Sequence, residues 1–187
     1  TVEVSNTVSG CSSLSLAQAI FLYVLNAVSS SLNATTFCEN DSAILNVQPQ
    51  GMNYQWYQNN ISIPAAVDDS LIVHLQGNYF SIVSNGVCSD SSNSLNIIVE
   101  TLPSVTFSGL PDTMCIYHSA VTLTGAPPGG NYVAAGMTGN IFDPSVAGAG
   151  DHLVAYQYSD SNGCANEFSK NVFVDVCSGI GNINADN

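Results

Sequence analysis

Six cysteines are the residues of this chain with the clearest chemistry, because a thiol can form a disulfide, bind a metal or act as a nucleophile. They stand at Cys11, Cys38, Cys88, Cys115, Cys164 and Cys177. No two are spaced as C-x-x-C, and the three histidines that would complete a zinc site lie far apart in the sequence. We therefore expect disulfides rather than a metal site, and with them an oxidising, extracytoplasmic compartment.

The spacing of the cysteines indicates an internal repeat. Cys11 and Cys88 are 77 residues apart, Cys38 and Cys115 are again 77 apart, and Cys88 and Cys164 are 76 apart. Five cysteines on one lattice predict a repeat of about that length. The lattice places one domain at 33–100 and a second at 101–187, which includes a short C-terminal tail. Residues 1–32 match only the last two strands of a repeat, so they form an orphan hairpin of a preceding domain or strands donated to a neighbour.

Each predicted domain contains two lattice cysteines. We expect the disulfides Cys38–Cys88 and Cys115–Cys164, each clipping one end of its domain.

Cys11 and Cys177 are then left over, one near each end of the chain. An intermolecular Cys11–Cys177 bond would join subunits head to tail and give an open filament. The alternative is that each pairs with a segment beyond this sequence.

Charge excludes two classes of partner. The chain has one lysine, no arginine and fourteen acidic residues, for a net charge of −13. Nucleic-acid binding and a polybasic membrane anchor both need clustered cations, so neither is expected. The apolar run at 16–28 contains Gln18 and Asn26 and is short for a membrane span, so a buried strand is the better interpretation.

No arrangement of residues predicts catalysis or a cofactor. Serine, histidine and aspartate are present, but no nucleophile elbow occurs. The pairs Asp68-Asp69 and Asp160 with Asn162 lack the oxygen-ligand number of a calcium loop, and we interpret them as turns. We therefore expect a protein that is not an enzyme and holds neither cofactor nor metal.

Aromatic residues predict the fold. In 53–60 aromatic and polar residues alternate, which puts Tyr54 and Trp56 on one face of a strand, and that face is expected to point inward. Tyr79 follows Gly77-Asn78 and resembles a tyrosine corner. An aromatic sugar-binding platform around Trp56 is the less favoured alternative.

Short strands recur about every ten residues between Gly, Pro, Asn and Asp turns, which predicts an all-β protein of tandem immunoglobulin-like β-sandwiches. The expected strands are 1–5, 16–25, 43–47, 53–58, 71–75, 79–83, 95–99, 120–124, 132–133, 141–142, 153–158 and 171–176.

With these patterns in place, the chain resembles the immunoglobulin-like repeats of Bacteroidetes surface proteins. The motifs that carry the resemblance are Cys38…Tyr54-Gln55-Trp56-Tyr57…Gly77-Asn78-Tyr79…Cys88 and Cys115…Leu123-Thr124-Gly125-Ala126-Pro127-Pro128-Gly129-Gly130…Asp160-Ser161-Asn162-Gly163-Cys164. The resemblance implies a secreted adhesin, filament or enzyme accessory region exported by the type IX system. It also implies O-glycosylation at Asp-Ser/Thr-apolar tripeptides, here Ser42, Ser70 and Thr113.

Together these observations predict an extracellular structural protein, a segment of a cell-surface filament or adhesin. Its expected partners are copies of itself in a fibre, joined by strand sharing, or neighbouring immunoglobulin-like repeats, and surface glycans. The alternative function is a glycan-binding accessory module of a secreted enzyme. A buried Trp56 would count against that alternative.

Overall fold

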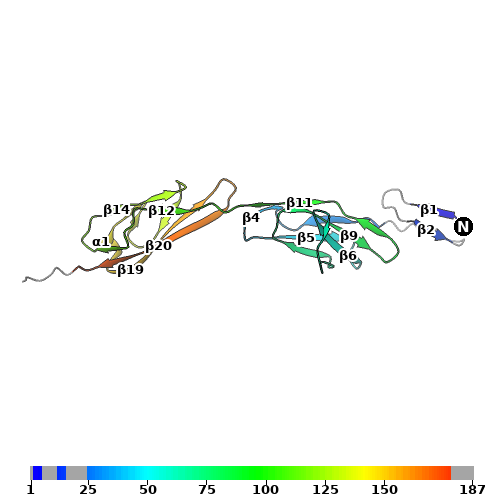
Figure 1. Ribbon diagram of the computed structural model, residues 1–187, viewed down its shortest axis with the longest axis horizontal. Helices are drawn as coiled ribbons and strands as arrows, with labels where there is room; N and C mark the ends of the chain where they lie inside the picture. Colours follow the sequence, from blue (N-terminus) through cyan, green and yellow to red (C-terminus); the bar gives the residue numbers. More distant parts are fainter. Residues whose placement is uncertain (1, 6–11, 16–24, 178–187) are drawn as a thin grey trace, which may run out of the picture. The chain divides into compact units, whose positions relative to one another are not determined.

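The computed structural model describes residues 2–5, 12–15 and 25–177. In these residues the chain is almost entirely β-structure, with a single four-residue helix, α1 (Pro144–Ala147). Contacts divide the chain into two compact units, 1–101 and 102–187, which we call unit 1 and unit 2 (Figure 1).

The N-terminal hairpin is formed by β1 (Val2–Ser5) and β2 (Ser12–Ser15), which pair antiparallel. β1 agrees with the strand expected at 1–5. The strand expected at 16–25 falls almost wholly outside the described residues, as does Cys11.

The first sheet of unit 1 has the order β3–β5–β8, formed by β3 (Val28–Ser31), β5 (Ala43–Gln48) and β8 (Ser70–Val73). The domain begins before the predicted start at 33, because β3 already belongs to this sheet. β3 pairs with β5, and Ser29 is also tied to the opposite sheet, since its N–H donates to Asn93 Oδ1 at 2.8 Å. The buried side chains of Leu25 and Ala27 pack in the same core. Residues from Leu25 onward therefore belong to this sandwich and not to an orphan hairpin.

The second sheet of unit 1 has the order β4–β11–β9–β6–β7, and β10 pairs with β9. Its strands are β4 (Thr36–Cys38), β6 (Asn53–Gln58), β7 (Ile61–Ser62), β9 (Gly77–Ser84), β10 (Ser89–Ser91) and β11 (Leu95–Glu100). β4 runs parallel to β11, while the other pairs in this sheet are antiparallel. Two sheets of this kind, with β3 in one and the following strand, β4, in the other, form an immunoglobulin-like sandwich.

The core of unit 1 is centred on Trp56, which is fully buried. Its indole Nε1–H donates to the carbonyl oxygen of Asp68 at 3.0 Å, so its one polar group is satisfied. Tyr79 is also buried, and its hydroxyl donates to the carbonyl oxygen of Leu75 at 2.9 Å. The tyrosine corner predicted at Tyr79 is therefore confirmed, as is the inward face of the Trp56 strand.

Unit 2 is built on the sheet β13–β20–β19–β16. The strands are β13 (Thr113–Cys115), β16 (Asn131–Val133), β19 (Gly150–Ser159) and β20 (Ala165–Asp175). The β19–β20 hairpin is drawn in orange and red in Figure 1. β13 is parallel to β20, as β4 is to β11 in unit 1.

Two smaller sheets complete unit 2, β12–β15 and β14–β18–β17. They contain β12 (Thr106–Ser108), β14 (Val121–Thr122), β15 (Thr124–Ala126), β17 (Met137–Thr138) and β18 (Ile141–Phe142). The strand expected at 120–124 is thus interrupted at Leu123, which is buried. The prediction of an all-β, immunoglobulin-like fold is confirmed.

Candidate functional site

The disulfide pattern differs from the predicted one in unit 2. Cys115 is bonded to Cys177, with Cα atoms 5.4 Å apart. The predicted bonds Cys115–Cys164 and Cys11–Cys177 are therefore wrong. β13 runs parallel to β20 with Cys115 opposite Asp175, so Cys177 follows within reach, whereas Cys164 precedes the other end of an eleven-residue strand. That strand length corresponds to about 36 Å, far beyond the span of a disulfide.

The predicted bond Cys38–Cys88 is wrong for the same kind of reason. Cys38 is the last residue of β4, opposite Glu100 at the end of β11. Cys88 lies past Ser84, at the opposite end of the eight-residue β9. About 25 Å of strand separates the two ends. Cys38 and Cys164 do each form a disulfide, as expected for those two residues.

The three serine and threonine residues expected to carry O-glycans lie in or beside strands. Ser70 in β8 and Thr113 in β13 are exposed, and Ser42 is half-buried. Their modification stays a prediction.

A row of polar side chains crosses the outer face of unit 2. Asn131 in β16 is directly opposite Gln157 in β19, and Gln157 is directly opposite Glu167 in β20. All three residues are exposed. Residues opposite one another on neighbouring strands point to the same side of a sheet, so an amide, a second amide and a carboxylate stand side by side.

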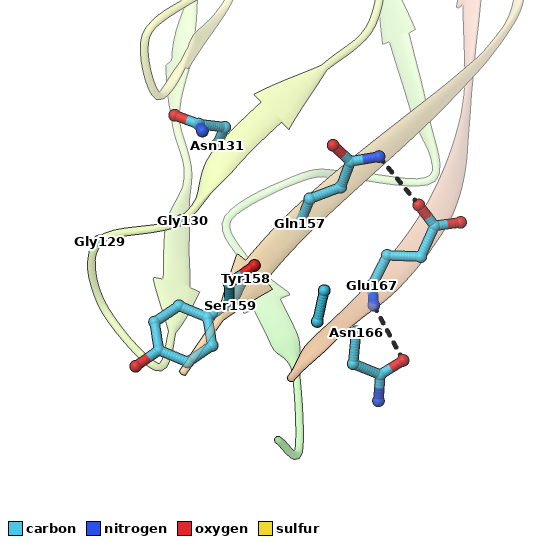
Figure 2. A pocket seen from close by; sticks show the side chains of 9 residues that line it. Gly129, Gly130, Asn131, Gln157, Tyr158, Ser159, Asn166 and Glu167 are labelled. Carbon is cyan, nitrogen blue, oxygen red and sulfur yellow. Dashed lines mark hydrogen bonds between the residues drawn. The ribbon is translucent and has the colours of Figure 1, made fainter. Parts of the chain in front are cut away.

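Small residues beside this row open a cleft of about 620 Å³. On the outward face, the position after Gln157 and the position before Glu167 are Ser159 and Ala165, which are opposite one another. Gly129 and Gly130 form the adjoining edge. In Figure 2, Gly129 and Gly130 lie on one side of the cleft, and Gln157 and Glu167 lie on the other. The complete lining is Gly129, Gly130, Asn131, Gln157, Tyr158, Ser159, Ala165, Asn166 and Glu167.

Hydrogen bonds fix the polar wall. Gln157 Nε2–H donates to Glu167 Oε2 at 3.1 Å (Figure 2). The backbone N–H of Glu167 donates to Asn166 Oδ1 at 2.9 Å, and Asn166 Nδ2–H donates to the carbonyl oxygen of Pro103 at 2.9 Å. The carboxylate therefore stands on an anchored segment of β20.

Tyr156 fixes the glycine wall from below. Its buried hydroxyl donates to the carbonyl oxygen of Pro127 at 2.6 Å and accepts from the N–H of Gly130 at 2.8 Å. A Cβ at Gly130 would lie 2.3 Å from the backbone oxygen of Gln157, and one at Gly125 would lie 2.2 Å from the Tyr156 ring. The sequence does not predict this contact, because the tyrosine is 26 residues further along the chain than Gly130.

The electrostatics of unit 2 leave the cleft without a cation. Lys170, the one cationic side chain of the sequence, has its Nζ 2.8 Å from Asp112 Oδ1 and 2.7 Å from the carbonyl oxygen of Leu110. Its hydrogen bond and its charge lower the pKa of the Asp112 carboxyl below the ordinary value. Below the sheet, burial and the neighbouring Tyr156 raise the pKa of the Tyr132 hydroxyl.

One ring nitrogen of each histidine contacts a backbone atom. His74 Nδ1 is 3.2 Å from the carbonyl oxygen of Asp41, and His152 Nε2 is 2.8 Å from that of Gly148. His118 Nδ1 accepts from the N–H of Cys115. In the described part of the chain, no three His, Cys, Asp or Glu side chains are grouped to hold a metal ion. Nor is any helix in that part long and apolar enough to cross a membrane.

Unit 1 offers a different pair of aromatic residues on its outer face. Trp56 is buried, so it is not a sugar-binding platform. Tyr57 and Phe80, which point outward from β6 and β9, stack with ring centroids 5.0 Å apart. Their faces are turned to each other, and both side chains are half-buried.

Comparisons with known proteins add little to this geometry. No protein-family model and no curated protein matches the chain. Among solved structures, murine CEACAM1b is 14% identical, with a TM-score of 0.36 over 80% of this chain and 100% of that one. An ice-binding adhesin of an Antarctic bacterium is 13% identical, with a TM-score of 0.41 over 82% of this chain and 49% of that one. The eight N-terminal immunoglobulin domains of Down syndrome cell adhesion molecule are 13% identical, with a TM-score of 0.44 over 79% of this chain and 27% of that one.

Proposed function

We propose that this protein is an adhesive module of a cell surface, a rigid immunoglobulin-like scaffold that presents a binding cleft on unit 2. The observation that carries the proposal is the polar cleft at Asn131, Gln157 and Glu167, which is exposed and whose two walls are both held by hydrogen bonds. Binding sites on rigid strands keep their geometry without a ligand, which lowers the entropic cost of binding.

Two further features support an extracellular location. Disulfides persist in oxidising compartments, and in this chain Cys115–Cys177 joins the edge strand β13 to the end of β20. The surface has almost no cations and a net charge of −13, which keeps a protein apart from nucleic acids and acidic lipid surfaces.

The finer assignment is a Bacteroidetes-type adhesin or filament segment, exported by the type IX system and O-glycosylated at Ser42, Ser70 and Thr113. Filament formation would use the β1–β2 hairpin, supplying strands to a neighbouring copy. Deletion of residues 1–24 should then convert fibres seen by negative-stain microscopy into monomers. Fibres that persist after this deletion would exclude strand sharing. Mass spectrometry of the protein from its native source tests the glycans.

We further propose that the protein has no catalytic activity. The proposal rests on the sequence, in which no nucleophile elbow occurs. The role of accessory module to a secreted enzyme remains the second candidate. It is favoured by the same cleft, but Trp56 contributes nothing to it.

Adhesion is tested with beads coated with the purified chain, incubated on bacterial cells and on films of neutral polysaccharide. We expect retention above that of beads coated with the reduced and carboxymethylated chain. If the two kinds of bead are retained equally on every surface, the folded protein is not adhesive.

A further inference from the structure

We propose that the cleft of unit 2 binds a neutral saccharide, which lies along the row formed by Asn131, Gln157 and Glu167. The inference rests on the proposed adhesive function and adds to it the chemical class of the ligand. It is carried by the strand register, which places three hydrogen-bonding side chains in line on one exposed face.

The row offers donors and acceptors in alternation. One N–H of Gln157 is used on one oxygen of Glu167. Since an amide has two N–H groups and a carbonyl oxygen, and a carboxylate has two oxygens, further donors and acceptors remain for a ligand. Sugar hydroxyls both donate and accept, so adjacent hydroxyls can pair with an amide and a carboxylate at once.

The dimensions of the row also suit a saccharide. Neighbouring strands lie about 4.8 Å apart, a spacing close to the length of one pyranose unit. Ser159, Ala165 and Gly129 keep the space beside the row open, where larger side chains would fill it. The Tyr158 ring takes no part in the row, because Tyr158 alternates with Gln157 and Ser159 along β19 and its ring packs against the core of unit 2.

Charge selects against the other small polar ligands. Glu167 is acidic, and Lys170 is engaged with Asp112, so nothing in the cleft would balance a phosphate, a sulfate or an acidic sugar. A calcium ion needs six to eight oxygen ligands, usually with several carboxylates. The cleft has a single carboxylate. A neutral, hydroxyl-rich ligand is what these groups match.

The first test is NMR titration of the full ¹⁵N-labelled chain with maltohexaose, laminarihexaose, chitohexaose and mannohexaose, and with heparin as an anionic contrast. We expect at least one neutral oligosaccharide to shift the side-chain amide signals of Asn131 and Gln157, with a dissociation constant in the range of about 0.1–10 mM. Heparin should leave them unchanged. The same titration with CaCl₂ distinguishes an ion from a sugar.

Matched variants locate the site. Gln157→Ala and Glu167→Ala should each weaken binding about tenfold, because each leaves a hydroxyl of the bound sugar unpaired. Asn171→Ala is the control, since it removes an exposed amide from the same face of β20, opposite Leu153 and outside the cleft. Thermal unfolding checks that all three variants are folded.

Each outcome decides between hypotheses. If no neutral oligosaccharide shifts Asn131 or Gln157 at about 20 mM, or if only CaCl₂ or heparin does, the saccharide proposal is wrong. If a sugar binds but coated beads are not retained on any surface, the adhesive function fails while the site stands. If beads are retained equally with wild-type and Glu167→Ala protein, adhesion stands and uses another surface.

Discussion

The hydroxyl of Tyr156 donates a hydrogen bond of 2.6 Å to the carbonyl oxygen of Pro127, across 29 residues of sequence. The same oxygen accepts from Gly130, so one buried side chain fixes both ends of the turn that borders the cleft. Phenylalanine would keep the ring and remove both contacts.

Tyr156→Phe should lower the free energy of unfolding by about 1–3 kcal/mol, because the half-buried carbonyl of Pro127 and the half-buried N–H of Gly130 lose their partner. Urea unfolding followed by circular dichroism measures the change. Tyr158→Phe, on the same strand, is the matched control and should change stability by less than about 0.5 kcal/mol. Equal effects from the two substitutions would show that the Tyr156 hydroxyl does not hold the turn.

Replacing both Cys115 and Cys177 by serine should destabilise unit 2 strongly. The bond closes a loop with a sequence separation of 62, which corresponds to about 4 kcal/mol in the loop-entropy model. Calorimetry of the variant and of wild-type protein measures the loss. Peptide mapping without reductant should recover Cys115 and Cys177 in one linked pair. A linked Cys115–Cys164 pair would contradict the structure.

The Lys170–Asp112 ion pair should make stability depend on pH. Lys170 lowers the folded-state pKa of Asp112, so the stabilisation is fully present above the unfolded pKa of about 3.9 and is lost as pH falls through the folded-state value. Urea midpoints between pH 6 and pH 2 should fall less steeply in Asp112→Asn than in wild-type protein. Lys170→Met should flatten the curve in the same way. Parallel curves for all three proteins would show that the pair contributes nothing.

Trp56→Phe should lower stability by about 2–3 kcal/mol, because the carbonyl of Asp68 loses its donor and the core loses volume. Circular dichroism is the appropriate probe, since the substitution removes the single tryptophan. Saccharide titrations of the folded variant should match those of wild-type protein. Loss of saccharide binding in this variant would show that Trp56 contributes to the binding site.

The sequence predicted the fold well because the information for it is local. Alternation around Trp56 and the Gly-Asn before Tyr79 fix which side chains point inward, and both interpretations are confirmed. The start of unit 1 was misplaced because β3 consists of one valine and three serines, a composition typical of a linker. Only its pairing with β5 reveals it as a strand.

The disulfides and the cleft could not be predicted, because both depend on which strands are neighbours. Cys115 meets Cys177 only because β13 runs parallel to β20. Likewise, Asn131 and Glu167 are 36 positions apart and are brought into one row by the register of β19. Neither the disulfide nor the row can be inferred from the spacing of these residues along the chain.

The Cys115–Cys177 bond also determines how unit 2 carries a mechanical load. A pulling force that enters before Cys115 and leaves after Cys177 passes through the sulfur atoms, so residues 116–176 are shielded from it. Without the bond, the extended length of 102–176 would be about 25 nm, but with the bond only 102–114 can be drawn out, about 4 nm. Under such a load unit 2 would therefore lengthen little, and its cleft would stay folded.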